Sequence, residues 1–144
     1  MDNLTLVFKE HNLKLTPQRI AVYKYLKGTT EHPSAETIYT ALHEDYPTMS
    51  LATLYKALKT LTEVGLIQEL NLGENNFRYD ANTSSHPHVK CINCGRVDDI
   101  MGLDYSTLVI DAEKHSDYTI LSDQVYFFGV CSNCQKKKNR LVIY

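Results

Sequence analysis

The chain has 144 residues, of which 43% are hydrophobic and 22% are charged, an ordinary balance for a globular protein of one or two domains. It has no apolar run near the roughly 20 residues that span a bilayer, and its N-terminal segment is too polar for a signal peptide, so we expect a cytoplasmic protein. The formal net charge is -2 and neither half is strongly basic, which counts against a broad basic surface but allows a local basic patch.

Three helices are predicted in the first half of the chain, each after a polar capping residue. Thr16 is expected at the N-cap and Pro17 at the first position of a helix that ends near Gly28. Ser34 and Ser50 are expected to cap the next two helices. Leucines in the third repeat at helical spacing and predict a buried face.

A β-hairpin is predicted after the helices, because two short apolar runs flank the Gly-Glu-Asn-Asn sequence at residues 73–76. Three helices followed by a hairpin is the order of a winged helix-turn-helix. The polar residues 82–85 are interpreted as a linker.

The sequence of the second half of the chain predicts several strands and one helix. Residues 89–91 and 96–100 are expected to form strands, residues 108–112 a helix, and residues 118–131 one or two strands. Residues 136–140 form a charged run. The apolar residues 141–144 that follow it have no assigned role.

The four cysteines form two C-x-x-C pairs, Cys91 with Cys94 and Cys131 with Cys134, separated by 36 residues. Two such turns can supply the four thiolates of a tetrahedral zinc site. Buried free thiols or a redox pair are the alternatives. Four thiolates leave no open coordination position, so a structural role is predicted for the zinc.

A second group of possible metal ligands surrounds the first cysteine pair. His86 and His88 are two residues apart, so in an extended segment both side chains face the same way and suit one ion. Taken alone, such a pair is equally well explained as a surface feature, and single aspartates are more often solvated. The remaining candidates are His32, Asp80, Asp98 and Asp99.

The chain resembles the ferric uptake regulator family over about residues 4–138, and most of all its peroxide-responsive branch. The resemblance is carried by the motifs LTPQR, HPSAETIY, MSLATLYKALKTLTEVGLI, FRYD, HPHVKCINCGRVDD and GVCSNC. Members are homodimeric, metal-dependent repressors that bind DNA. The resemblance implies an α+β fold with a winged helix-turn-helix DNA-binding domain at residues 1–81, a linker at 82–85 and a small α/β dimerisation and metal-binding domain at 86–144.

Two metal sites follow from the resemblance. The structural Zn(II) falls on the four cysteines, as their spacing also predicts. The ligands of a regulatory Fe(II) or Mn(II) ion are His32, Asp80, His86, His88 and Asp99. Asp98 is interpreted as a bystander. In a peroxide sensor, hydrogen peroxide reacts with bound Fe(II) and a ligand histidine is oxidised; His32 and His86 match the oxidised positions.

Four positions favour the peroxide-responsive branch. Asp99 is an aspartate where iron-uptake members tend to have glutamate, and Ser85 and Pro87 replace ligands of an additional metal site. Asp123 stands near a position where a histidine is often found. The alternative is an iron-uptake regulator or a repressor that responds to zinc or manganese.

The helix after Ser50 is the candidate recognition helix, and the expected partner is double-stranded DNA with a palindromic operator. Lys56 stands where the family often has arginine, which would weaken a bidentate guanine contact. The predicted DNA contacts are Lys14, Arg19, Ser50, Thr53, Tyr55, Lys56 and Arg78.

An enzyme is the competing class of function. A metallohydrolase needs an open metal position with a general base nearby, and a C-x-x-C oxidoreductase needs one reactive dithiol. A third interpretation is a zinc-stabilised adaptor whose histidines and aspartates bind nothing. We predict a repressor without enzymatic activity.

Overall fold

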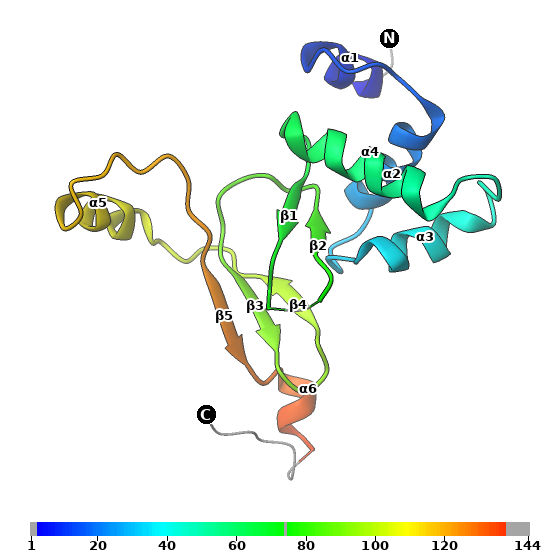
Figure 1. Cartoon of the computed structure of the whole chain (residues 1–144). Helices are drawn as coiled ribbons and strands as arrows, with labels where there is room; N and C mark the ends of the chain where they lie inside the picture. The colour runs from blue at the N-terminus through cyan, green and yellow to red at the C-terminus, as the bar shows by residue number, and fades with distance from the viewer. Residues whose placement is uncertain (1–2, 74, 138–144) are drawn as a thin grey trace. The chain divides into compact units, whose positions relative to one another are not determined.

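The computed structural model describes residues 3–73 and 75–137, and Figure 1 shows the order of the elements. The chain divides into two compact units, Met1–Thr83 and Ser84–Tyr144. The apolar residues 141–144 and the last part of the charged run at 136–140 lie outside the described residues. None of the helices in the described part has the length and apolar character of a membrane span.

Helices dominate the described part of the first unit. Its elements are α1 (Asn3–Glu10), α2 (Pro17–Lys27), α3 (Ala35–His43), α4 (Leu51–Glu63), β1 (Gln68–Leu70) and β2 (Arg78–Asp80). The three predicted caps are confirmed: the hydroxyl oxygens of Thr16, Ser34 and Ser50 each accept the backbone N–H of the residue three positions later. These caps fix where α2, α3 and α4 begin.

The core of the first unit lies between its helices and the hairpin. Val22 of α2, Ile38 of α3 and Leu54 of α4 have no exposed surface. The helix α1 joins this core through Phe8, whose ring meets that of Tyr23 edge-on with the centroids 5.8 Å apart. The sequence did not predict α1, because eight residues are too few for a distinctive helical period.

The predicted hairpin is confirmed as the antiparallel pair β1 and β2, with Gln68 opposite Asp80. The segment before α3 lies along this hairpin as well. Ser34 forms an isolated antiparallel bridge with Arg78, and the N–H of Tyr79 donates to the carbonyl of Pro33 at 3.0 Å. The first unit is therefore three helices with a wing, preceded by α1.

The second unit contains a three-stranded sheet. Its elements are β3 (His88–Cys91), β4 (Val97–Asp99), α5 (Ser106–Lys114), β5 (Tyr126–Gly129) and α6 (Ser132–Gln135). The central strand β3 pairs antiparallel with β4 and parallel with β5 (Figure 1). The α+β class is confirmed.

Two details of the second unit differ from the sequence prediction. Only residues 126–129 of the expected strand region at 118–131 are strand, and residues 119–125 are irregular. The polar residues Ser122 to Gln124 interrupt the run of strand-forming residues there. The helix α6 was not predicted, because it has only four residues and overlaps the second C-x-x-C pair.

Candidate metal centres and nucleic-acid interface

The structure brings the four cysteines together within the second unit. Cys91 ends β3, Cys94 follows in the turn before β4, Cys131 is the N-cap residue of α6 and Cys134 lies in that helix. Their four sulfur atoms all lie within 4.8 Å of one another. Residues from two distant parts of the sequence therefore form one cluster.

The geometry of the cluster fits a tetrahedral zinc site. The Sγ atoms of Cys94 and Cys131 are 3.8 Å apart. Zinc–sulfur bonds of about 2.3 Å place two ligands of a tetrahedron about 3.8 Å apart, whereas a disulfide requires about 2.05 Å. All four thiols are free. With four sulfur ligands the site is closed, which is the arrangement of structural zinc.

Electrostatics point to the same cation. Burial alone would raise the pKa of the Cys91 thiol, but the N–H groups of Cys131, Cys94 and Asn93 favour the thiolate and lower this pKa to about 6. Burial and the neighbouring thiols raise the pKa of Cys134 to about 12. Four thiols this close cannot all ionise unless a cation compensates the repulsion between the thiolates.

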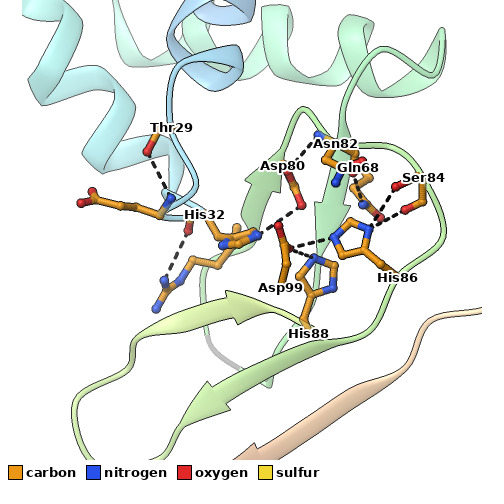
Figure 2. Close-up of polar contacts among 11 residues, drawn as sticks. Thr29, His32, Gln68, Asp80, Asn82, Ser84, His86, His88 and Asp99 are labelled. Atoms are coloured by element: carbon orange, nitrogen blue, oxygen red, sulfur yellow. Dashed lines mark hydrogen bonds and ion pairs between the residues drawn. The ribbon is translucent and has the colours of Figure 1, made fainter. Parts of the chain in front are cut away.

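A pair of possible ligands lies in the first unit. The Nε2 atom of His32, in the loop before α3, is 3.2 Å from Oδ2 of Asp80 at the end of β2 (Figure 2). The other carboxylate oxygen of Asp80, Oδ1, accepts the backbone N–H of Asn82 at 2.8 Å. This second bond fixes which oxygen of Asp80 faces the imidazole.

Three further possible ligands converge in the second unit. His88 of β3 is directly opposite Asp99 of β4 in the register of the sheet. The Nε2 atoms of His86 and His88 are 2.8 Å and 3.2 Å from Oδ1 of Asp99 (Figure 2). The Nδ1 atom of His86 lies 2.6 Å from the carbonyl of Ser84. A carbonyl can only accept, so Nδ1 carries a proton and Nε2 faces the Asp99 carboxylate.

Both groups have the spacing of metal ligands. Bonds of about 2.1 Å at right angles place neighbouring ligand atoms about 3 Å apart. In neutral His86 the Nε2 atom has a lone pair that the Asp99 carboxylate would repel, so the contact requires a proton or a cation. Imidazole and carboxylate ligands together suit Fe(II), Mn(II) or Zn(II). Two ligands in one unit and three in the other are each too few for a full shell.

Neighbouring residues of the sequence do not join these groups. Asp98, the predicted bystander, accepts a hydrogen bond from Nε of Arg96 at 2.8 Å, and both side chains are about half exposed. Ser85 lies with Oγ 2.6 Å from the hydroxyl of Tyr105 and 3.5 Å from Oδ1 of Asp123. Ser85 and Asp123, two of the positions where an additional metal site was not expected to be complete, are therefore bonded to each other.

The predicted recognition helix is α4, and its leucines face the core as expected. Tyr55 and Lys56 are exposed. Ser50 and Thr53 are engaged in the cap, with their hydroxyl oxygens 2.9 Å apart. The hydroxyl of Tyr55 donates to Oε1 of Glu36 in α3 at 2.8 Å, and this bond raises the pKa of Tyr55.

The three basic residues predicted outside α4 have specific positions. Arg19 donates from its guanidinium to the carbonyl of Lys14 at 2.9 Å, and Lys14 is exposed. Arg78 in β2 donates to the carbonyl of His32 at 3.3 Å. The structure thus places two of the predicted DNA-contacting guanidinium groups against backbone carbonyls.

Sequence reasoning missed the groups that orient the ligands. The N–H of Asn82 and the carbonyl of Ser84 act on Asp80 and His86, and the amide of Gln68 donates to the carbonyl of Asn82 at 2.6 Å. Backbone groups occur at every position, so residue types alone carry no signal for the first two. The sequence did not indicate the role of Gln68 either, since its partner Asn82 is 14 residues away and follows the other strand of the hairpin.

The sequence model of the ferric uptake regulator family matches residues 10–128. The chain belongs to the ferric uptake regulator family. "Transcriptional regulator PerR" of Clostridium acetobutylicum is 65% identical over 137 residues, which are 95% of this chain and 99% of that protein. "Peroxide-responsive repressor PerR" of Staphylococcus aureus strain Mu50 is 33% identical over 129 residues, 90% of this chain and 87% of that protein.

Solved structures of the ferric uptake regulator family agree with the observed fold. The Campylobacter jejuni peroxide stress regulator has a TM-score of 0.73 and 36% identity, covering 93% of this chain and 100% of that one. The Helicobacter pylori ferric uptake regulator has a TM-score of 0.76 over 94% of this chain and 91% of that one, at 23% identity, which shows the fold alone.

These comparisons confirm the predicted family and its peroxide-responsive branch. Ferric uptake regulators are DNA-binding, dimeric transcriptional regulators. The chain is therefore a transcriptional regulator and not an enzyme, and both enzyme interpretations of the sequence are set aside.

Proposed function

We propose that this regulator is a metal-dependent repressor that senses hydrogen peroxide through Fe(II)-catalysed oxidation of a ligand histidine. One observation carries the proposal: the chain has one complete set of thiolate ligands in a single unit and two incomplete sets of histidine and aspartate ligands, one in each unit. Its similarity to peroxide-responsive repressors supports the same function.

In this proposal a single Fe(II) or Mn(II) ion takes ligands from both units. The ligands are His32 and Asp80 of the first unit and His86, His88 and Asp99 of the second. Such an ion favours the one arrangement of the two units in which all five ligands reach it. Moving a population from 1:99 to 99:1 takes about 5.5 kcal/mol of differential binding.

The residues around the ligands prepare them for this task. The carbonyl of Ser84 holds the proton of His86 on Nδ1 and so presents Nε2 as the ligand atom. The N–H of Asn82 turns Oδ2 of Asp80 toward His32. Bound Fe(II) would supply the electrons that reduce hydrogen peroxide. Because this reduction takes place at the ion, the nearest imidazole is the group that is oxidised. Once His32 or His86 is oxidised, it binds the ion poorly. The arrangement of the two units that the ion favours, which we call the closed arrangement, is then lost.

The closed arrangement would be the one that binds DNA. Tyr55 and Lys56 on the exposed face of α4 are the proposed contacts in the major groove, and Lys14, Arg19 and Arg78 are proposed to lie near phosphates. Ser50 and Thr53 would act at the start of the helix, where backbone N–H groups favour an anion. We place the protein in the cytoplasm, where its DNA would be.

We also propose that the protein binds a palindromic operator as a homodimer, and the exposed side chains of the second unit support the homodimer. Large apolar side chains are exposed there, and none of the side chains of α5 is buried. Exposed apolar side chains in this number favour burial against a partner. The exposed residues are Met101, Leu103, Leu108, Ile110, Tyr118, Leu121, Phe127 and Phe128.

The test is peptide mass spectrometry of the zinc-loaded protein after a low dose of hydrogen peroxide, with Fe(II) or Mn(II) in the regulatory site. We expect an added oxygen on His32 or His86 with Fe(II) only, together with loss of operator binding. If no oxygen is added and operator binding simply follows the metal concentration, the protein is an iron-uptake or a zinc- or manganese-responsive repressor instead.

A further inference from the structure

The loop that carries His32 is attached to strand β2 by several hydrogen bonds. The carbonyl of Pro33 accepts the N–H of Tyr79 at 3.0 Å, and Ser34 forms a β-bridge with Arg78. Within the loop, the hydroxyl of Thr29 accepts the N–H of Glu31 at 3.1 Å (Figure 2). The position of His32 therefore depends on β2.

His32 itself has an unfavourable backbone conformation. Its φ angle is 54°, in the left-handed region that residues with a Cβ atom seldom adopt. Such a conformation persists only where surrounding contacts enforce it. The guanidinium of Arg78 makes one of these contacts, because it donates to the carbonyl of His32 at 3.3 Å.

Strand β2 thus holds His32 at two points. Arg78 and Asp80 are two residues apart on the strand, so their side chains share a face. Arg78 bonds to the backbone of His32, and Asp80 faces its imidazole with 3.2 Å between Oδ2 and Nε2. The backbone contact sets the direction in which the imidazole leaves the chain.

We propose that Arg78 is the positioning residue of the first half of the regulatory site. By holding the carbonyl of His32, it keeps the left-handed backbone from which the imidazole reaches the same ion as Asp80. This inference rests on the proposed function. It assigns Arg78 a task that requires no DNA, whereas a phosphate contact alone would leave metal binding unchanged in the absence of DNA.

The experiment measures Mn(II) affinity of the zinc-loaded, full-length protein without DNA. Arg78→Met removes every donor, and we expect it to weaken Mn(II) binding about 10- to 100-fold, the usual effect of losing a group that orients a ligand. Arg78→Lys keeps one charged donor and should retain part of the affinity. Arg19→Met is the matched control, because Arg19 also donates to a backbone carbonyl, but to that of Lys14 and not to that of His32. It should bind Mn(II) within about twofold of the wild type.

Wild-type Mn(II) affinity in Arg78→Met would overturn the inference and leave Arg78 as a DNA contact only. If Arg78→Met does not fold, judged by zinc content and circular dichroism, Arg78→Lys decides: weaker Mn(II) binding supports the inference and wild-type binding overturns it. A His32→Ala variant distinguishes a failure of this inference from a failure of the proposed function. If His32→Ala binds Mn(II) like the wild type, the proposed function itself is wrong.

Discussion

The chain contains two sets of candidate metal ligands, and it distributes them in different ways. The four cysteines come from distant parts of the sequence but belong to a single unit, where their sulfur atoms lie within 4.8 Å of one another. The five proposed histidine and aspartate ligands are divided, with His32 and Asp80 in the first unit and the other three in the second.

The comparison shows how one type of interaction can serve two purposes. A closed site within one unit adds its binding free energy to the folding of that unit, so the metal is part of the structure. A site that needs ligands from two units adds its binding free energy to the equilibrium between their arrangements, so the metal is a signal. The four predictions that follow test this distinction.

The largest effect is expected from Cys134→Ser. This variant should lose zinc completely and unfold the second unit, because structural zinc in small domains binds with about 10 to 16 kcal/mol. Native mass spectrometry and near-ultraviolet circular dichroism measure the two changes. The first unit should keep its helices. A variant that loses zinc but keeps a folded second unit would show that the cysteine cluster is not structural.

Asp99→Ala should abolish regulatory metal binding and leave the zinc in place. We expect Mn(II) affinity to fall by more than about 100-fold, since a ligand and not only an orienting group is removed. Asp98→Ala is the matched control on the same strand, because Asp98 only pairs with Arg96 at the surface. Isothermal titration with Mn(II) measures both. Equal losses in the two variants would contradict the assignment of Asp99.

Lys56→Ala should weaken operator binding by about 1 to 2 kcal/mol without changing either metal site. Lys56 is exposed on α4, and Lys24 on α2 offers a control lysine that is also exposed and not predicted to contact DNA. Fluorescence anisotropy with operator DNA measures the affinity at several salt concentrations. If Lys24→Ala and Lys56→Ala weaken binding alike, α4 is not the recognition helix.

Ser50→Ala should give the smallest effect, a loss of about 1 kcal/mol in the stability of the first unit. The variant removes the oxygen that accepts the N–H of Thr53 at 3.1 Å and so loosens the start of α4. Thermal unfolding followed at helical wavelengths reports the change. Zinc content should stay at the wild-type level, and zinc loss in this variant would argue against independent units.

The sequence predicted most of the first unit because its signals are local. Caps at Thr16, Ser34 and Ser50 and the turn at 73–76 act on residues a few positions away. The cysteine site was equally predictable, since the spacing of two C-x-x-C pairs is typical of a zinc site. The irregular residues 119–125 were not, because strand propensity depends on which partner strand is available.

The orienting contacts of the candidate site could not be predicted from the sequence. The bond from Arg78 to the carbonyl of His32 joins positions 46 residues apart, and the left-handed backbone of His32 has no marker in a histidine. Arg78 was predicted to contact DNA because of its charge and its place in the wing. A charge shows that a side chain needs polar partners and does not show which ones it has.

The central claim is that one regulatory ion needs ligands from both units. The most direct measurement is a Mn(II) titration of three zinc-loaded proteins: the wild type, His32→Ala and His86→Ala. The account predicts one Mn(II) per chain in the wild type and loss of that ion in both variants, with zinc retained throughout. Two Mn(II) ions per chain, or tight binding that survives in either variant, would show that the two units bind metal separately and would contradict the claim.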